Sequence, residues 1–206
     1  IQTFKNSGSI EGKHSSEGNG GVYFQDNVTI NTFHNEGTIE GKEGKNSISL
    51  KAQGNKTPTL ENFINEGTIK GKIGIENKNG FSGTITVKTF ENKGKGFIDG
   101  HIYMGLWGGN GTISIENFNN EGTITNNNSD RGVHFQGKNN AKVYINTFKN
   151  SGTIKGEGAE KGQGVYFQDI HSAIKTFENT GFISGSGDNS TAGGLHTGGG
   201  VVMSGG

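Results

Sequence analysis

One short motif recurs seven times along the 206 residues of this chain, and its regular spacing constrains the fold more than any other feature. Each copy reads aliphatic residue, any residue, Thr or Asn, Phe, any residue, Asn, and a Gly-x-Ile follows a few residues later. The motif phenylalanines lie 27 to 30 residues apart, at Phe4, Phe33, Phe63, Phe90, Phe118, Phe148 and Phe177. A repeat of this length indicates a solenoid, in which each coil buries its apolar face only against its neighbours.

Every repeat contains three short apolar patches bounded by Gly and Asn. The first ends at the motif Phe, the second surrounds the Ile of Gly-x-Ile, and the third is an alternating pair such as Val133 and Phe135. Apolar residues at every second position are typical of strands. We therefore predict an all-β fold, a right-handed parallel β-helix (solenoid) of about seven coils of ~29 residues, with three short strands per coil. Coils ~4.8 Å apart would make a rod roughly 34 Å long.

The chain must turn within three residues between the first and second patches. An Asn opens this corner in every repeat, at Asn6, Asn35, Asn65, Asn92, Asn120, Asn150 and Asn179. We expect these asparagines to stack, with each amide donating to the coil next to it. A Gly follows two residues later in six repeats, and we expect the corner to use the left-handed conformation that Gly and Asn tolerate. Residues 92–98 hold two extra residues, which predicts a bulged corner in the fourth coil.

The composition fits a thin, regular core. Hydrophobic residues make up 28% of the chain and glycine contributes 39 residues, yet the apolar residues recur in register, which argues against disorder. Because the repeat runs from the first residues to the last, we expect residues 1–206 to form a single β-helix segment, excised from a longer array and uncapped at both ends. A net charge of zero with one arginine argues against nucleic-acid binding. The absence of cysteine excludes disulfides and thiol chemistry.

The run from Thr147 to Gly156, TFKNSGTIKG, and its six siblings resemble the Asn-x-Gly-x-Ile repeats of Gram-negative autotransporter passengers and filamentous-haemagglutinin-like adhesins. The Phe variant, with Gly-Val-Tyr-Phe-Gln, looks closest to large autotransporter-like surface proteins of Campylobacter and Helicobacter. The resemblance covers the whole chain. It implies a secreted or surface-exposed passenger used for adhesion, for aggregation or as a stalk, whose export signal and carboxy-terminal membrane barrel would lie outside this sequence.

Polysaccharide lyases and pectin hydrolases share this architecture, so we also consider catalysis. Such enzymes need clustered carboxylates for acid/base work or calcium binding. Asp26 and Asp169 share a column but lie five coils apart, roughly 24 Å. The glutamates mostly follow the corner Asn or the second-patch Ile, where a solvated face explains them. An enzyme should place two or three acidic residues on one face within two neighbouring coils. We find no such group in the sequence, so we expect no catalytic residues.

Other candidate sites have simpler structural explanations. The six histidines share no ligand spacing, so we expect no metal and no cofactor: His14, His34, His101, His134, His171 and His196. The segment from Gly185 to Asp188 resembles one unit of a calcium-binding nonapeptide repeat, but that motif works in tandem and occurs here once. A column of threonines precedes the second-patch Ile. Charged residues in the adjacent column and two Phe interruptions favour β-propensity over ice binding as its cause.

One outward column carries most of the aromatic rings that could face a partner. It lies between the inward residues of the third patch, and with the nearby Trp107 it supplies the candidate binding residues Tyr23, Tyr103, Trp107, His134 and Tyr166. These rings could stack on glycans or pack against a protein. We favour the simpler interpretation, in which they pack across strands under a neighbouring loop. If a binding site exists, we expect it on this face, beside the corners whose lengths vary most.

We therefore expect a structural and adhesive module of a bacterial surface or secreted autotransporter-like protein. Its partners would be a host-cell glycan or protein, or sister molecules, and contact with a membrane would come only through the absent barrel. The alternatives are a carbohydrate-active β-helix enzyme, acting as a lyase or hydrolase, and an inert stalk or spacer.

Overall fold

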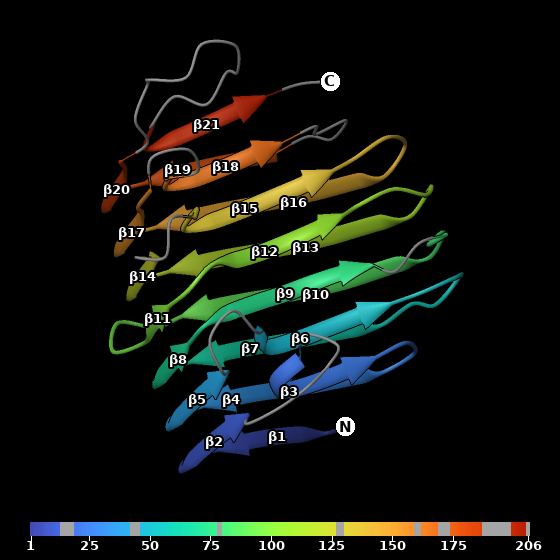
Figure 1. The fold of residues 1–206 in the computed structure, drawn as a ribbon, viewed down its shortest axis with the longest axis horizontal. Coiled ribbons are helices and arrows are strands. Elements are labelled where there is room, and N and C mark those ends of the chain that lie inside the picture. The colour runs from blue at the N-terminus through green and yellow to red at the C-terminus, as the bar shows by residue number, and fades with distance from the viewer. Residues whose placement is uncertain are drawn as a thin grey trace.

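The computed structural model describes residues 1–12, 19–41, 46–77, 80–126, 130–158, 162–168, 174–186 and 199–204. These residues form three parallel sheets of seven strands each and no helix (Figure 1). Consecutive strands of the chain belong to different sheets, and every third strand returns to the same sheet one coil further along. The predicted all-β parallel solenoid is therefore confirmed.

Each sheet collects one of the three apolar patches. Sheet A contains β1 (Thr3–Asn6), β4 (Thr29–Asn35), β7 (Thr59–Asn65), β10 (Thr84–Asn92), β13 (Thr112–Asn120), β16 (Lys142–Asn150) and β19 (Ile174–Asn179). Sheet B contains β2 (Ser9–Gly12), β5 (Thr38–Gly41), β8 (Thr68–Lys70), β11 (Phe97–Asp99), β14 (Thr123–Asn126), β17 (Thr153–Gly156) and β20 (Phe182–Gly185). Sheet C contains β3 (Asn19–Gln25), β6 (Asn46–Ala52), β9 (Lys72–Asn77), β12 (Ile102–Leu106), β15 (Val133–Gly137), β18 (Val165–Gln168) and β21 (Val201–Ser204).

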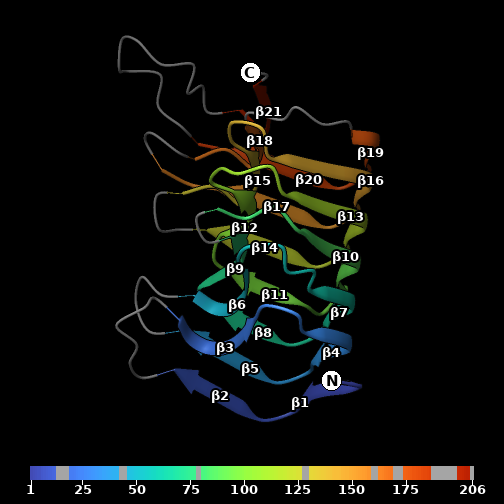
Figure 2. The ribbon, with the colours of Figure 1, turned by 90° about the vertical axis from the view of Figure 1, so that its right-hand side faces the viewer.

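The coil winds in the right-handed sense. In Figure 1 the strands of sheet C run from left to right in front of sheet A while the chain climbs from its N-terminus to its C-terminus. The orthogonal view places sheets A and C on opposite sides of the rod (Figure 2).

The motif phenylalanines form one ladder through the core. Neighbouring rings are stacked within 5° of parallel, with centroids 4.4–4.9 Å apart. This spacing matches the separation of paired strands, so each ring occupies one coil. The five middle rings, from Phe33 to Phe148, are at most 1% exposed, whereas Phe4 and Phe177 in the end coils are only partly buried.

The corner asparagines form a second ladder. Each Nδ2 donates to the Oδ1 of the Asn in the next coil at 2.7–2.8 Å, from Asn6 through to Asn179. The same amide also donates to a backbone carbonyl of its own corner, as Asn120 does to Gly122 at 3.2 Å. Each buried side chain thus satisfies donors and acceptors along the rod, and the predicted stacking is confirmed.

The conformational reason we expected for the corner glycines is wrong. Among the described residues, the left-handed region holds Asp26, Asn139 and six glycines, none of which belongs to an Asn-x-Gly corner. A Cβ on Gly37, Gly67, Gly122, Gly152 or Gly181 would instead collide with backbone of the preceding coil. At Gly152 it would overlap the carbonyl oxygen of Gly122. These corners need glycine because the coils approach closely.

This distinction gives a stability test. Gly152→Ala and Gly152→Asn should each lower the free energy of unfolding by about 1–3 kcal/mol, because either residue adds a Cβ against the backbone of the neighbouring coil. A left-handed position would tolerate Asn better than Ala. Denaturant titration of the two variants checks this, and a clear advantage for Asn would restore the conformational explanation.

Two further features concern the length of elements. The extra residues of the fourth coil form a turn at Gly94 and Lys95, while the Asn92 amide still reaches a corner carbonyl, that of Gly96, at 3.2 Å. The predicted bulge is therefore a local insertion.

The sequence analysis missed that β10, β13 and β16 have nine residues. Their longer strands add Ile85, Ile113 and Val143 to the core.

Candidate binding face and side-chain clusters

The outer face of sheet C brings three of the predicted binding residues together. Tyr103 on β12 pairs with His134 on β15, which pairs with Tyr166 on β18. All three side chains are buried, at most 4% exposed. The two tyrosines lie outside the cluster of apolar residues that fills the rod. Tyr23 on β3 and Trp107 after β12 are exposed, Trp107 by 55%. The predicted face therefore has an accessible part and a covered part.

The covered rings pack on one another. The His134 ring centroid lies 5.1 Å from that of Tyr103 and 5.2 Å from that of Tyr166. Tyr103 Oη donates to Gln136 Oε1 at 3.0 Å, and His134 Nε2 lies 3.1 Å from Gln168 Oε1. This arrangement is the cross-strand packing that we favoured, and it leaves these three rings no exposed surface for stacking on a ligand.

Charged groups lie over this ring ladder. The Arg131 guanidinium carbon is 4.5 Å from the Tyr166 ring centroid, and Arg131 Nε donates to Gln163 Oε1 at 3.0 Å. Asp130 Oδ2 lies 3.2 Å from His101 Nδ1, and Asp130 Oδ1 lies 3.5 Å from Arg131 Nη1. The sequence analysis considered His101 and the single arginine separately and did not bring them together with Asp130, because corners of variable length hide their proximity.

The burial of these groups sets their pKa values. Burial lowers the pKa of His134 far below its ordinary value, and the nearby Arg131 and His101 lower it further. Burial also lowers the pKa of His101, against the opposing effect of its contact with Asp130. Burial alone would raise the pKa of Asp130, but the contacts with His101 and the Arg131 backbone N–H outweigh it and lower that pKa. The cluster therefore consists of neutral histidines beside an ionised Asp–Arg pair.

One atom of this cluster lacks a partner. His101 Nε2 is buried without a hydrogen bond, while its Nδ1 faces Asp130. A neutral imidazole that donates from Nδ1 presents a bare lone pair at Nε2. This is the arrangement of a His–Asp pair, but no nucleophilic side chain within the described residues bonds to Nε2. Within the described residues, the cluster is a set of polar side chains packed beside the buried rings of sheet C, with Asp130 partly exposed.

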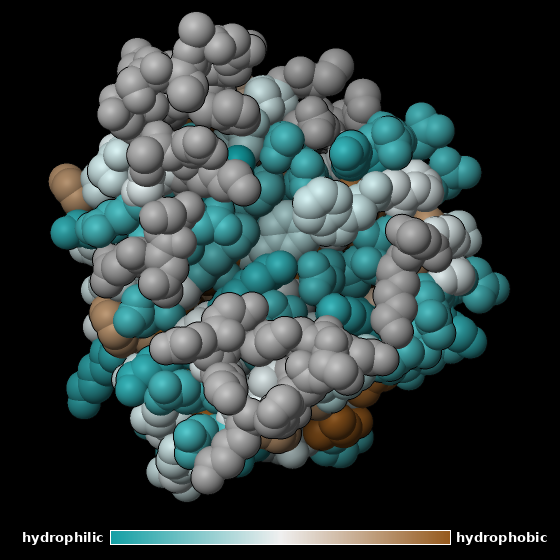
Figure 3. Space-filling view, viewed as in Figure 1, coloured by the Kyte–Doolittle hydropathy of each residue, from teal (hydrophilic) through white to brown (hydrophobic). Residues whose placement is uncertain are grey.

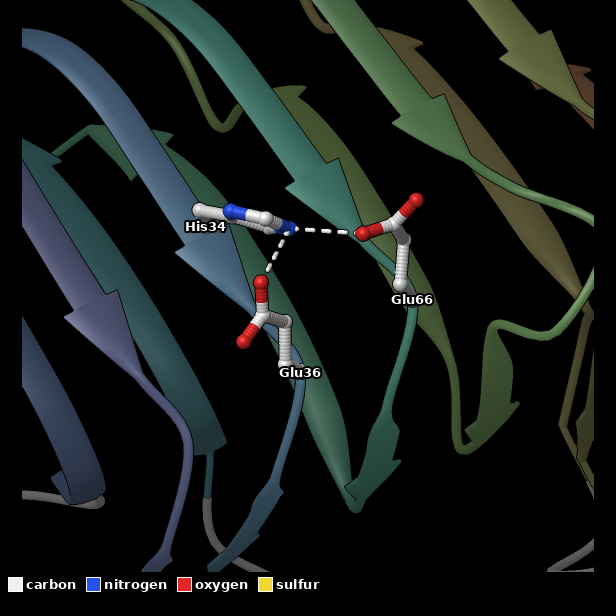
Figure 4. Close-up of side chains that lie close together, drawn as sticks. All are labelled: His34, Glu36 and Glu66. Atoms are coloured by element: carbon white, nitrogen blue, oxygen red, sulfur yellow. Dashed lines mark hydrogen bonds and ion pairs between the residues drawn. The ribbon is translucent and has the colours of Figure 1, made fainter.

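A second cluster lies at the Asn corner of sheet A (Figure 4). His34 Nε2 is 2.8 Å from Glu66 Oε2 and 3.6 Å from Glu36 Oε1, so one nitrogen faces two carboxylates. Glu36 also pairs with Lys5 Nζ at 2.8 Å. The expectation that no two acidic residues share a face in neighbouring coils is therefore wrong for Glu36 and Glu66. These three residues are the one His/Asp/Glu group within the described ranges whose ligand atoms lie within 4.8 Å of one another.

A signal for this second cluster was present in the sequence. Asn35 pairs with Asn65, so the residues that follow them, Glu36 and Glu66, are neighbours along the rod, and His34 is two residues before Glu36. Aligning the coils on the Asn would have revealed the group, whereas the spacing of histidines alone could not. Asp169, Asp188, His14, His171 and His196, which the sequence analysis also weighed, lie outside the described residues.

The surface over sheet C is mostly hydrophilic where the structure describes it (Figure 3). Exposed large apolar side chains are scattered among the elements: Ile1, Tyr23, Phe97, Trp107, Tyr144, Phe182, Val201 and Met203. The described residues contain no helix that is long and apolar enough to cross a membrane. Comparisons of the chain with protein-family models, curated proteins and solved structures found no match.

Proposed function

We propose that this chain is a structural and adhesive module of a bacterial surface or secreted protein of the autotransporter type, which presents a rigid side face to a host glycan, a host protein or a sister molecule. The observation that supports this most is the regularity of the rod. Three parallel sheets run along the rod, and an unbroken Phe ladder and an unbroken Asn ladder connect its successive coils. A scaffold of this kind holds surface side chains at fixed spacings, and loops on rigid scaffolds commonly carry recognition.

Trp107 is the binding residue that the geometry favours. Its backbone N–H donates to Asn77 Oδ1 at 2.9 Å, and Asn77 Nδ2 donates to the Gly108 carbonyl at 2.9 Å, so the neighbouring coil fixes this corner. The indole itself is 55% exposed, with Lys138 Nζ 5.9 Å from the ring centroid. An exposed aromatic ring on a fixed backbone suits stacking on a sugar ring or packing against a protein. One such contact is weak, and many copies of the rod would strengthen it.

The test is cell or glycan binding by multivalent beads that display the rod. Trp107→Ser should reduce bead binding at least tenfold. Tyr144→Ser removes a different exposed ring, on β16 of sheet A, and should leave bead binding unchanged. The buried Tyr103 and Tyr166 are unsuitable probes, because their loss would disturb the fold. Equal binding by wild type and Trp107→Ser would remove this corner from consideration. Absence of binding by the wild-type rod would favour the inert stalk or spacer.

A carbohydrate-active enzyme would need carboxylates close together in neighbouring coils, and Glu36 and Glu66 meet that requirement. Both lie on an exposed corner, where Lys5 Nζ pairs with Glu36 and His34 Nε2 lies 2.8 Å from Glu66 Oε2. A general acid usually has its pKa raised by a protected site, whereas the Lys5 contact lowers the pKa of Glu36. We therefore expect no release of sugar ends when the rod is incubated with acidic or neutral polysaccharides.

A further inference from the structure

We propose that His34, Glu36 and Glu66 form a surface site for a divalent transition-metal ion of the zinc type. The three side chains come from two neighbouring coils and converge on one point beside the Asn ladder (Figure 4). The site is independent of the binding role proposed for Trp107, because the Asn corner joins sheets A and B whereas Trp107 lies between sheets C and A.

The backbone fixes where these side chains start. His34 is the penultimate residue of β4, and Glu36 follows that strand directly. Glu66 occupies the same corner position after β7, which pairs with β4 in register through Asn35 and Asn65. The His34 imidazole and the Glu36 carboxylate point toward one another at the end of β4 (Figure 4). The buried Asn35–Asn65 hydrogen bond, at 2.8 Å, holds the two coils in this register.

The distances suit a metal ion. With zinc bonds of about 2.0–2.1 Å, ligand atoms around a tetrahedral ion lie about 3.3 Å apart. His34 Nε2 lies 2.8 Å from one carboxylate oxygen and 3.6 Å from the other, which brackets that separation. The side chains are partly exposed, with exposed fractions of 21%, 37% and 41% for His34, Glu36 and Glu66, so small rotations can open the centre. Water would complete the coordination.

The chemistry of the three ligands selects the ion. An imidazole nitrogen suits zinc, copper, nickel or iron, whereas magnesium and calcium prefer oxygen ligands alone. Two carboxylates with a neutral imidazole carry a charge of −2, which a divalent ion would neutralise. Lys5 Nζ, 2.8 Å from Glu36 Oε1, competes with the ion for that carboxylate.

The experiment is calorimetric titration of the tag-free chain with zinc chloride, and with magnesium chloride as the contrasting ion. We expect one zinc ion per chain at pH 7.4, and no binding of magnesium at the same concentrations. His34→Gln and Glu66→Gln should each weaken zinc binding at least tenfold. Lys5→Ala should strengthen it several-fold, because it frees the Glu36 carboxylate.

The matched control is Glu121→Gln. Glu121 also follows a corner Asn, but the residue in the His34 position of that coil is Asn119, so this carboxylate lacks an imidazole neighbour and its loss should leave zinc binding unchanged. Circular dichroism of each variant checks that the fold is retained. Two results would overturn the proposal: no zinc binding at millimolar concentration, or equal zinc affinity in the wild type and His34→Gln. The second result would place the ion elsewhere on the chain.

Discussion

Phe118→Ala should lower the free energy of unfolding by about 3–5 kcal/mol, among the largest losses for any single substitution in this rod. The ring is fully buried between Phe90 and Phe148, whose centroids each lie 4.8 Å away. The Phe135 ring from sheet C meets it edge-on at 5.8 Å. Removing the ring leaves a cavity in the middle of the ladder. The coils on either side are held by their own backbone and Asn hydrogen bonds, so they cannot close it.

Glu121→Ala is the matched comparison, because Glu121 lies three residues further along the same coil and is exposed. Its replacement should change the free energy of unfolding by less than about 0.5 kcal/mol. Denaturant titration followed by circular dichroism gives both values. Similar midpoints for the two variants would contradict the assignment of the Phe column to the core.

The sequence predicts the Phe and Asn columns of this rod well, because the repeated motif shows which residues of successive coils lie beside one another. The motif Phe recurs at 27 to 30 residues, and a parallel coil then places each ring on the previous one. The same reasoning places Asn35 beside Asn65. These predictions need only the strand period and the corner position, which are both local properties of the chain.

The reason for the corner glycines was beyond this local reasoning. Left-handed backbone and close approach of two coils both call for a residue without a Cβ, and the sequence cannot distinguish them. The structure does, since Gly152 has no positive φ and its missing Cβ would meet the Gly122 carbonyl of the preceding coil. Whether glycine is required at such a corner depends on the distance between coils, which only the assembled rod defines.

The polar clusters were hidden for a different reason. His101 and Asp130 lie 29 residues apart, and both fall near the corner between sheets B and C, where coil lengths vary. The number of residues along the chain then no longer gives the position around the coil. The same variation left open whether Tyr103 and Tyr166 were exposed, because residues outside their strands, such as Arg131, decide it.

The buried histidines of sheet C should make the rod sensitive to mild acid. His134 lies among His101, Tyr103, Tyr166 and the Asp130–Arg131 pair, and burial holds its pKa far below the ordinary value of 6.5. Below pH 6.5 the unfolded chain therefore binds a proton at this position that the folded chain does not. Stability rises with pH wherever the unfolded state binds more protons, so it must fall as the pH is lowered through this range.

The expected loss is about 1.4 kcal/mol per pH unit for His134, or roughly 3 kcal/mol between pH 6.5 and pH 4.5. His101, whose pKa is also lowered by burial, adds to the loss below pH 6.5. Asp130 acts in the same direction, but its lowered pKa removes stability only below about pH 3.8, the ordinary value of its carboxyl group. The interval from pH 6.5 to pH 4.5 therefore isolates the histidines of this cluster.

The measurement is the free energy of unfolding of the wild type and His134→Gln at several pH values across that interval. Gln cannot titrate and can still hydrogen-bond to Gln168. The slope of the free energy of unfolding against pH should therefore be smaller for the variant than for the wild type by about 1.4 kcal/mol per pH unit, whatever the variant's stability at pH 7. Parallel curves for the two proteins would contradict the prediction. They would mean that His134 takes up its proton in the folded rod, which requires the ring to reach water past Arg131 and the flanking tyrosines. In that case these rings would also be open to a partner, and the outer face of sheet C would become a binding surface along its whole length.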